Sequence, residues 1–165
     1  WTPEGYAAVA DYAAERYGMR VILTGGPRAI EREYGEMITA RMSHAPVNLI
    51  GQTNLKELLA VIQGATALLA PDSGPAHLGT AVGTPVIGLY AATNPDRARP
   101  YLSERWVVNR YPEAVQAKYG KIPDQLPWGV RVRDPGTMER ITVEEVNRVL
   151  DELLTGPRLP DERAP

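Results

Sequence analysis

The stretch Pro71-Asp72-Ser73-Gly74-Pro75-Ala76-His77-Leu78 follows an apolar run and holds the residues best suited to chemistry. If a helix begins directly after Asp72, the backbone N–H groups of Ser73 and Gly74 form an anion site suited to a diphosphate. The Asp72 carboxylate suits the hydroxyl groups of a sugar, and His77, one turn into the helix, can donate to a phosphate oxygen. A structural interpretation stays open, in which Asp72 or Ser73 only caps the helix and His77 is a hydrogen-bonded structural residue.

A second turn that could face a phosphate or a sugar is Thr24-Gly25-Gly26, which follows the apolar run 21–23. Glycine allows positive φ angles and a close approach of the backbone to a ligand. The same residues also fit a simple tight turn between a strand and a helix, so both interpretations stay open. Further along, Asp96, Arg97 and Arg99 fit either a solvated loop or a contact with an anionic ligand.

Strands alternating with helices must position these residues. Apolar runs predict strands at 21–23, 47–50, 67–70, 85–90 and 106–108, and helical spacing predicts helices at 3–17, 28–42, 55–62, 76–82 and 143–154. This order predicts the α/β class, with a Rossmann-like parallel sheet that has helices on both faces and binds ligands at the carboxyl ends of its strands.

The rest of the chain breaks this alternation. Residues 111–136 are rich in Pro, Gly and charge and predict an irregular loop. We expect residues 1–155 to form one nucleotide-sugar-binding domain and residues 156–165 to form a flexible tail.

Composition narrows the functional classes. The chain has 165 residues, a formal charge of −2 and basic residues scattered among acidic ones, which argues against nucleic acid as a partner. It has no cysteine, which excludes disulfides and thiolate metal sites, and its two histidines cannot build a zinc site alone. No apolar run approaches the roughly 18–20 residues of a transmembrane helix. We therefore expect no transmembrane segment and a cytoplasmic location.

Residues 64–101 resemble the hallmark region of glycosyltransferase family 9, the family of the lipopolysaccharide heptosyltransferases. The resemblance is carried by the motif at 72–78, by Ala81-Val82-Gly83-Thr84-Pro85, by the apolar strand that follows and by the turn Thr93-Asn94-Pro95. Weaker similarity extends upstream over residues 21–26, 48–51 and 55–58, and downstream over residues 138–146.

This resemblance implies the C-terminal, donor-binding half of a GT-B fold. The implied reaction moves a heptose, or a related sugar, from a nucleotide diphosphate such as ADP-heptose to a lipopolysaccharide-type acceptor, with inversion. The family pattern places the donor sugar at Asp72, the diphosphate at Ser73, Gly74 and His77, and the nucleotide beside the turn 24–26 and the loop 51–55. It implies no cofactor and no metal ion, because GT-B enzymes generally neutralise the leaving diphosphate with helix dipoles and basic side chains.

The resemblance also implies that other parts of the enzyme lie outside this sequence. These are the acceptor-binding N-terminal half, the acidic general base and a basic residue just before Trp1, so we expect no catalytic residue here and an inactive fragment. Family members often carry Glu at the position of Lys56, where it meets the ribose, so Lys56 bears on the choice of nucleotide. Peripheral association with the inner membrane is a further expectation.

Two alternatives stay open. One is a UDP-N-acetylglucosamine 2-epimerase of GT-B-like architecture, which the His77 motif and the Thr93-Asn94-Pro95 turn fit poorly. The other is a nucleotide-binding module without turnover.

Overall fold

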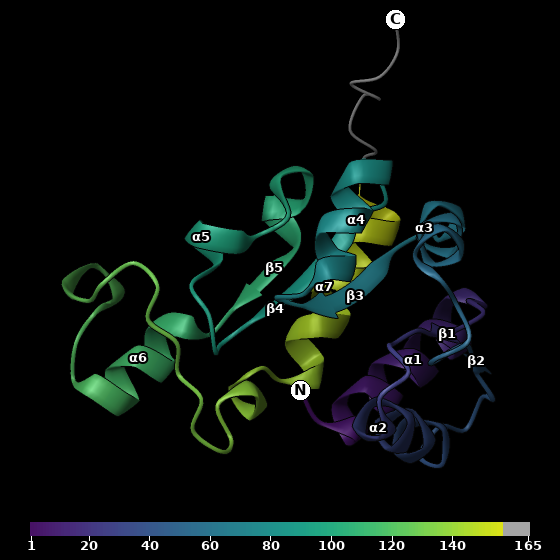
Figure 1. Cartoon of the computed structure of the whole chain (residues 1–165), viewed down its shortest axis with the longest axis horizontal. Coiled ribbons are helices and arrows are strands. Elements are labelled where there is room, and N and C mark those ends of the chain that lie inside the picture. Colours follow the sequence, from purple (N-terminus) through teal and green to yellow (C-terminus); the bar gives the residue numbers. More distant parts are fainter. Residues whose placement is uncertain (157–165) are drawn as a thin grey trace, which may run out of the picture.

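The computed structural model describes residues 1–156, in which helices alternate with short strands (Figure 1). The elements in chain order are α1 (Pro3–Tyr17), β1 (Ile22–Leu23), α2 (Ala29–Thr39), β2 (Val47–Asn48), α3 (Leu55–Gly64), β3 (Leu68–Pro71), α4 (Gly74–Val82), β4 (Val86–Tyr90), α5 (Pro95–Ala98), β5 (Val107–Asn109), α6 (Tyr111–Tyr119) and α7 (Val143–Thr155). Short 3₁₀ turns lie at Tyr101–Trp106, Pro123–Gln125 and Met138–Arg140. The tail predicted at 156–165 lies, apart from Gly156, outside the described residues.

All strand pairs are parallel, as predicted. Backbone hydrogen bonds join β1 to β2 and, separately, β3 to β4 and β4 to β5. Pro71 of β3 pairs with Leu89 of β4. Ile22 of β1 is 42% exposed. The described strands therefore form two parallel sheets. The turn 24–26 follows β1 of the first sheet, and residues 72–74 follow β3 of the second.

Helices cover both faces of the β3–β4–β5 sheet, which confirms the predicted layering. Ile87 and Leu89 of β4 lie in a buried cluster with Val146 of α7, whereas Val86 packs with Ala76 of α4. Successive side chains of a strand point to opposite faces. Therefore α7 lies on one face of β4 and α4 on the other.

Helix ends follow the local sequence. The Thr2 hydroxyl accepts a hydrogen bond from the N–H of Gly5 at 3.0 Å at the start of α1, and Gly18 ends that helix with a φ of 64°. The side chain of Asn54 caps α3 by accepting hydrogen bonds from the N–H groups of Lys56 and Glu57. Thr142 caps α7 in a capping box.

The prediction of an irregular loop over residues 111–136 is wrong in its first part, because α6 occupies Tyr111–Tyr119. Tyr111, Ala114 and Val115 are buried in a cluster with Val132. Their spacing is that of one helical face, and Pro112 suits the first turn of a helix. The average composition of a 26-residue segment concealed this short helix.

Within residues 1–156, no helix is both long and apolar enough to span a membrane.

Candidate functional site

The end of β3 brings Asp72, Ser73 and Gly74 to the N-terminus of α4. Ser73 is the N-cap residue, but its side chain makes no capping hydrogen bond, and its hydroxyl instead donates to the carbonyl of Pro71 at 3.1 Å. A Cβ built on Gly74 would meet no atom within 4 Å. The backbone N–H groups at the start of α4 therefore lack a side-chain cap and border open space, which is the arrangement of an anion site.

Asp72 lies beside the charge of Arg97. The Oδ2 atom of Asp72 is 3.9 Å from Nη2 of Arg97, and the Asp72 side chain is 19% exposed. Arg97 belongs to α5, whose first turn is capped by the side chain of Asn94. The structure thus assigns Arg97 to the site, whereas Arg99 pairs with Asp96 at 2.6 Å.

Tyr90, at the carboxyl end of β4, is the buried neighbour of Asp72. Its hydroxyl donates to the carbonyl of Ala98 at 2.8 Å, which ties the strand end to α5. Burial, together with the charge of Asp72, raises the pKa of Tyr90 to about 12. The phenol therefore stays protonated at neutral pH and holds this hydrogen bond.

His77 is exposed in the first turn of α4. Its side chain makes no hydrogen bond or ion pair with residues 1–156, so the interpretation as a hydrogen-bonded structural histidine lacks support. Likewise, the side chain of Asp72 does not cap α4, because Ser73 occupies the N-cap position.

At the second glycine-rich turn, a carboxylate from α2 lies on the backbone. The N–H of Gly26 donates to Oε2 of Glu31 at 2.5 Å. A Cβ on Gly25 would be 3.1 Å from the same oxygen and 3.3 Å from Ile50. The Glu31 carboxylate therefore occupies the place that a phosphate would take at this turn, and its own oxygens can accept hydrogen bonds from hydroxyl groups.

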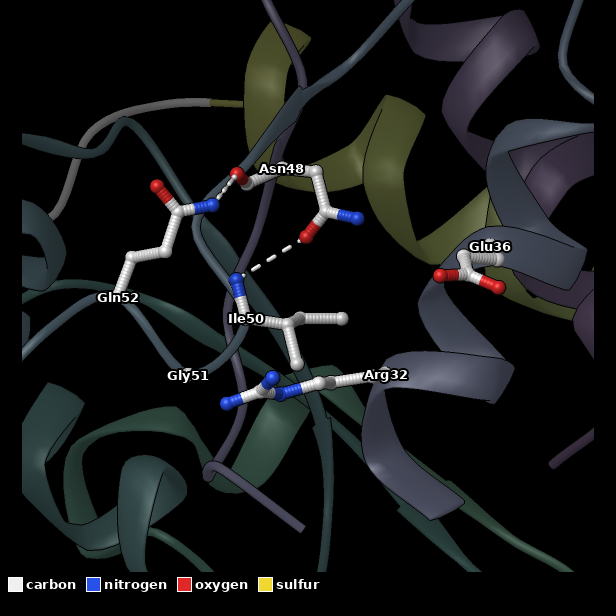
Figure 2. Close-up of a pocket in the computed structure, with 6 residues that line it drawn as sticks. All are labelled: Arg32, Glu36, Asn48, Ile50, Gly51 and Gln52. Atoms are coloured by element: carbon white, nitrogen blue, oxygen red, sulfur yellow. Dashed lines mark hydrogen bonds between the residues drawn. The ribbon is translucent and has the colours of Figure 1, made fainter. Parts of the chain in front are cut away.

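A polar cavity of about 310 Å³ lies between α2 and the end of β2 (Figure 2). It is lined by Arg32, Glu36, Asn48, Ile50, Gly51 and Gln52. The Asn48 side-chain oxygen accepts from the N–H of Ile50 at 3.0 Å, and the Gln52 amide donates to the carbonyl of Asn48 at 2.8 Å. This leaves the Asn48 amide nitrogen, the Gln52 side-chain oxygen, the Glu36 carboxylate and the Arg32 guanidinium as hydrogen-bonding groups at the cavity wall.

Gly51 lies in the turn between β2 and α3. Its φ is 71°, and a Cβ there would lie 3.2 Å from the Cα atom of Pro27 and 3.2 Å from Nε of Arg32. Only glycine fits this conformation and this close approach. Lys56 lies beyond the turn, exposed in the first turn of α3, where its N–H donates to the Asn54 side chain at 2.9 Å.

The structure brings some predicted residues together and leaves others apart. Asp72, Ser73 and Gly74 meet at one strand end, joined there by Arg97, while the turn 24–26 belongs to the other sheet with Glu31. Among residues 1–156, no group of three or more His, Cys, Asp or Glu side chains is placed to hold a metal ion.

Sequence reasoning missed Glu31 and left Arg97 undecided. A usable signal for Glu31 was its place in the first turn of the helix after a Gly-Gly-Pro turn, where acidic side chains are favoured. For Arg97 the sequence offered no comparable signal, because its contact with Asp72 joins residues 25 positions apart.

Comparisons with known proteins agree on one family. The profile of glycosyltransferase family 9 (heptosyltransferase) matches residues 1–125. The chain is 44% identical over 146 residues to a protein of Haemophilus influenzae named lipopolysaccharide core heptosyltransferase OpsX, covering 88% of this chain and 42% of that protein. It is 35% identical over 102 residues to lipopolysaccharide heptosyltransferase 3 of Escherichia coli, covering 61% and 29%.

Solved structures show the same fold. A glycosyl transferase family 9 protein of Veillonella parvula superposes with a TM-score of 0.72 over 95% of this chain and 42% of its own, at 24% identity. The ADP-heptose lipopolysaccharide heptosyltransferase II of Escherichia coli gives a TM-score of 0.68 over 94% and 42%, also at 24% identity. The chain thus spans less than half the length of these relatives.

Proposed function

The chain belongs to glycosyltransferase family 9, the heptosyltransferase family, and from this premise we propose that it is the donor-binding part of an enzyme that transfers a heptose, or a related sugar, to a lipopolysaccharide-type acceptor. The observation that carries the proposal is the uncapped N-terminus of α4 directly after Asp72. One strand end there presents backbone donors for a diphosphate and a carboxylate for a sugar.

The diphosphate of the donor lies at Ser73 and Gly74. Free N–H groups at the start of α4 point to this position, and the positive end of the helix dipole favours negative charge there. Arg97 adds a full positive charge nearby, and His77 is exposed one turn along the helix. In keeping with the family pattern, these groups neutralise the leaving diphosphate without a metal ion.

Asp72 binds hydroxyl groups of the transferred sugar. A carboxylate repels a phosphate but accepts strong hydrogen bonds from hydroxyls. Arg97 lies 3.9 Å from one carboxylate oxygen, so the second oxygen remains free to accept them.

The nucleoside of the donor lies between the turn 24–26 and the cavity of Figure 2. The Glu31 carboxylate, held by the N–H of Gly26, accepts hydrogen bonds from ribose hydroxyls. Asn48 and Gln52 present an amide donor and a carbonyl acceptor to the base. Adenine is the proposed base, with ADP-heptose as donor and Lys56 at the rim of the nucleotide site.

The general base and the reacting part of the acceptor site belong to a part of the enzyme beyond this sequence. That base would remove the proton of the acceptor hydroxyl, and inversion would follow by single displacement. The relatives that match are named heptosyltransferases, so the comparisons support neither the epimerase nor the module without turnover. A cytoplasmic location and an association with the inner membrane stay predictions.

A titration of this chain with ADP, followed by chemical shifts of the backbone amides, tests the proposal. We expect the amides of Ser73, Gly74, Gly26 and Gly51 to shift, with a Kd on the order of 0.1–1 mM, or about 4–5.5 kcal/mol. Shifts confined to residues 111–136 would show that the nucleotide binds elsewhere.

Asp72→Asn tests the sugar contact. ADP should bind the variant at least as well as the original chain, because a negative charge beside the diphosphate is removed. ADP-heptose should lose about five- to thirtyfold in affinity, since a charge-assisted hydrogen bond exceeds a neutral one by roughly 1–2 kcal/mol. Asp124→Asn, at an exposed carboxylate in a 3₁₀ turn, is the control. An unchanged affinity for ADP-heptose in Asp72→Asn would remove Asp72 from the site.

A further inference from the structure

Residues 130–134, here called the strap, cross the carboxyl end of β4. The N–H of Val132 donates to the carbonyl of Ala92 at 2.9 Å, and Arg131 forms an antiparallel bridge with Thr93. In Figure 1 the yellow-green chain that follows α6 passes close to the N-terminus on its way to α7. The strap therefore lies at the carboxyl end of β4, and Asp72 lies at the carboxyl end of the neighbouring strand β3.

Alternate residues anchor the strap to the protein. The carbonyl of Val130 accepts from the Tyr111 hydroxyl at 2.9 Å, Val132 is buried, and the Asp134 carboxylate pairs with Lys118 at 2.8 Å. These contacts and the bridge at Arg131 hold the strap without using the side chains of Arg131 or Arg133.

Arg131 and Arg133 are both exposed, whereas Val132 between them is buried. Side chains at i and i+2 of an extended segment lie on one face, about 6.6 Å apart along the chain. Within residues 1–156, neither guanidinium makes a hydrogen bond or an ion pair. Two exposed arginines therefore flank the buried Val132 on an anchored backbone.

Arg133 also forms part of the wall of a cavity of about 270 Å³. The cavity is lined by Trp1, Thr2, Tyr34, Ala92, Val132, Arg133, Asp134, Gly136, Thr137, Met138 and Glu139. Of its two carboxylates, Asp134 is paired with Lys118, while Glu139 can accept hydrogen bonds from hydroxyls. Aromatic rings, one carboxylate and one guanidinium make a lining suited to a saccharide with an acidic group.

We propose that Arg131 and Arg133 bind an anionic group, a phosphate ester or a carboxylate, of the saccharide acceptor, and that the adjoining cavity takes part of the sugar that bears it. This assignment to the acceptor rests on the proposed function. The transferred sugar lies between the donor diphosphate and the acceptor, and the diphosphate is at the end of β3. An acceptor approaching the sugar at Asp72 then meets the end of β4, where the strap lies.

Titration of the chain with inorganic phosphate tests the anion site. We expect phosphate to shift the amides of Arg131 and Arg133, with an affinity that falls as sodium chloride is added. Arg131→Gln and Arg133→Gln should each weaken binding about three- to tenfold, as for the loss of one charge-assisted contact. Both substitutions keep the anchors at Val130, Val132 and Asp134. Arg148→Gln, at an exposed arginine of α7, is the matched control and should bind phosphate like the original chain.

Equal affinity in the original chain, Arg131→Gln and Arg133→Gln would overturn the site. Repeating the titration with ADP present at saturation separates the two sources of the anion. Phosphate should still shift Arg131 and Arg133, because the acceptor and the donor occupy different positions. If ADP alone shifts these residues and competes with phosphate, they contact the donor diphosphate and the assignment to the acceptor is wrong.

The same titrations separate this inference from the proposed function. Failure of ADP to shift Ser73 and Gly74 contradicts the donor site alone, whereas failure of phosphate to shift Arg131 and Arg133 contradicts the acceptor site alone.

Discussion

Two residues lie next to the Asp72 carboxylate, Arg97 of α5 and Tyr90 of β4. Nη2 of Arg97 lies 3.9 Å from one oxygen of this carboxylate. Tyr90 lies buried beside it, with its hydroxyl turned to the carbonyl of Ala98. The phenol therefore secures the position of α5, and α5 in turn carries Arg97 to the carboxylate.

Tyr90→Phe tests this support. The variant leaves the carbonyl of Ala98 without its donor, which should cost about 1 kcal/mol of unfolding free energy and lower the thermal midpoint by roughly 2–4 °C. The cost should depend on pH. Folding raises the pKa of Tyr90 to about 12, so above pH 10 the unfolded chain releases this proton first and the stability of the original protein falls.

The difference in unfolding free energy between the original protein and Tyr90→Phe should therefore be largest below pH 10 and shrink toward pH 12. Denaturant unfolding at pH 8, 10 and 11.5 measures it. All other ionisable groups are common to both proteins. If the difference in unfolding free energy stayed constant from pH 8 to 11.5, folding would not raise the pKa of Tyr90.

Among the elements, α4 is the one whose distance from the sheet sets the geometry of the donor site. Gly79 makes a close approach possible, since a Cβ there would lie 2.6 Å from Cγ2 of Val86 and 3.4 Å from the carbonyl of Thr84. Thr84 ties the end of this helix–strand unit to α3, because its hydroxyl donates to the carbonyl of Ile62 at 2.7 Å.

Gly79→Ala should push α4 away from β4. We expect a loss of about 1–3 kcal/mol of unfolding free energy from overpacking, together with weaker ADP binding, because the N-terminus of α4 moves with the helix. Gly64→Ala is the control, since a Cβ there meets no atom within 4 Å and alanine favours the helix. Chemical denaturation and ADP titration of both variants measure the effect. Equal stability of Gly79→Ala and Gly64→Ala would show that α4 accepts a Cβ at position 79 without moving away from β4.

At the scale of the whole molecule, the two sheets differ in burial and in the length of their strand pairs. The β3–β4–β5 sheet is buried between helices on both faces, whereas β1 and β2 pair over two residues each. Local opening requires less free energy where few buried contacts are lost. The nucleoside side of the proposed donor site thus rests on the less stable sheet.

Hydrogen exchange should reveal this difference. The amides of Val47 and Leu49, which donate to Val21 and Leu23, should exchange at least about tenfold faster than those of Leu68 and Arg110, which donate to Pro85 and Tyr90. A tenfold ratio corresponds to about 1.4 kcal/mol of opening free energy. Adding ADP should slow exchange in the first pair if the nucleoside binds there. Equal protection in both sheets without ADP would contradict two units of different stability.

The sequence by itself determined the class of fold, the strands β3 to β5 and the place of Asp72, Ser73 and Gly74. These follow from local rules: short apolar runs make buried strands, caps start helices, and a strand end that leads into a helix N-terminus presents free N–H groups. The long motif at 72–95 indicated the family, and the matching family profile then showed it.

Only the tertiary structure decided which distant residues meet. Arg97 beside Asp72 and the anchors that leave Arg131 and Arg133 exposed depend on contacts between separate segments. Local pattern carries no information on such contacts, because they depend on how helices and strands pack in space. The division into two sheets has the same origin, since hydrogen bonds between strands are set by packing and not by the sequence of either strand.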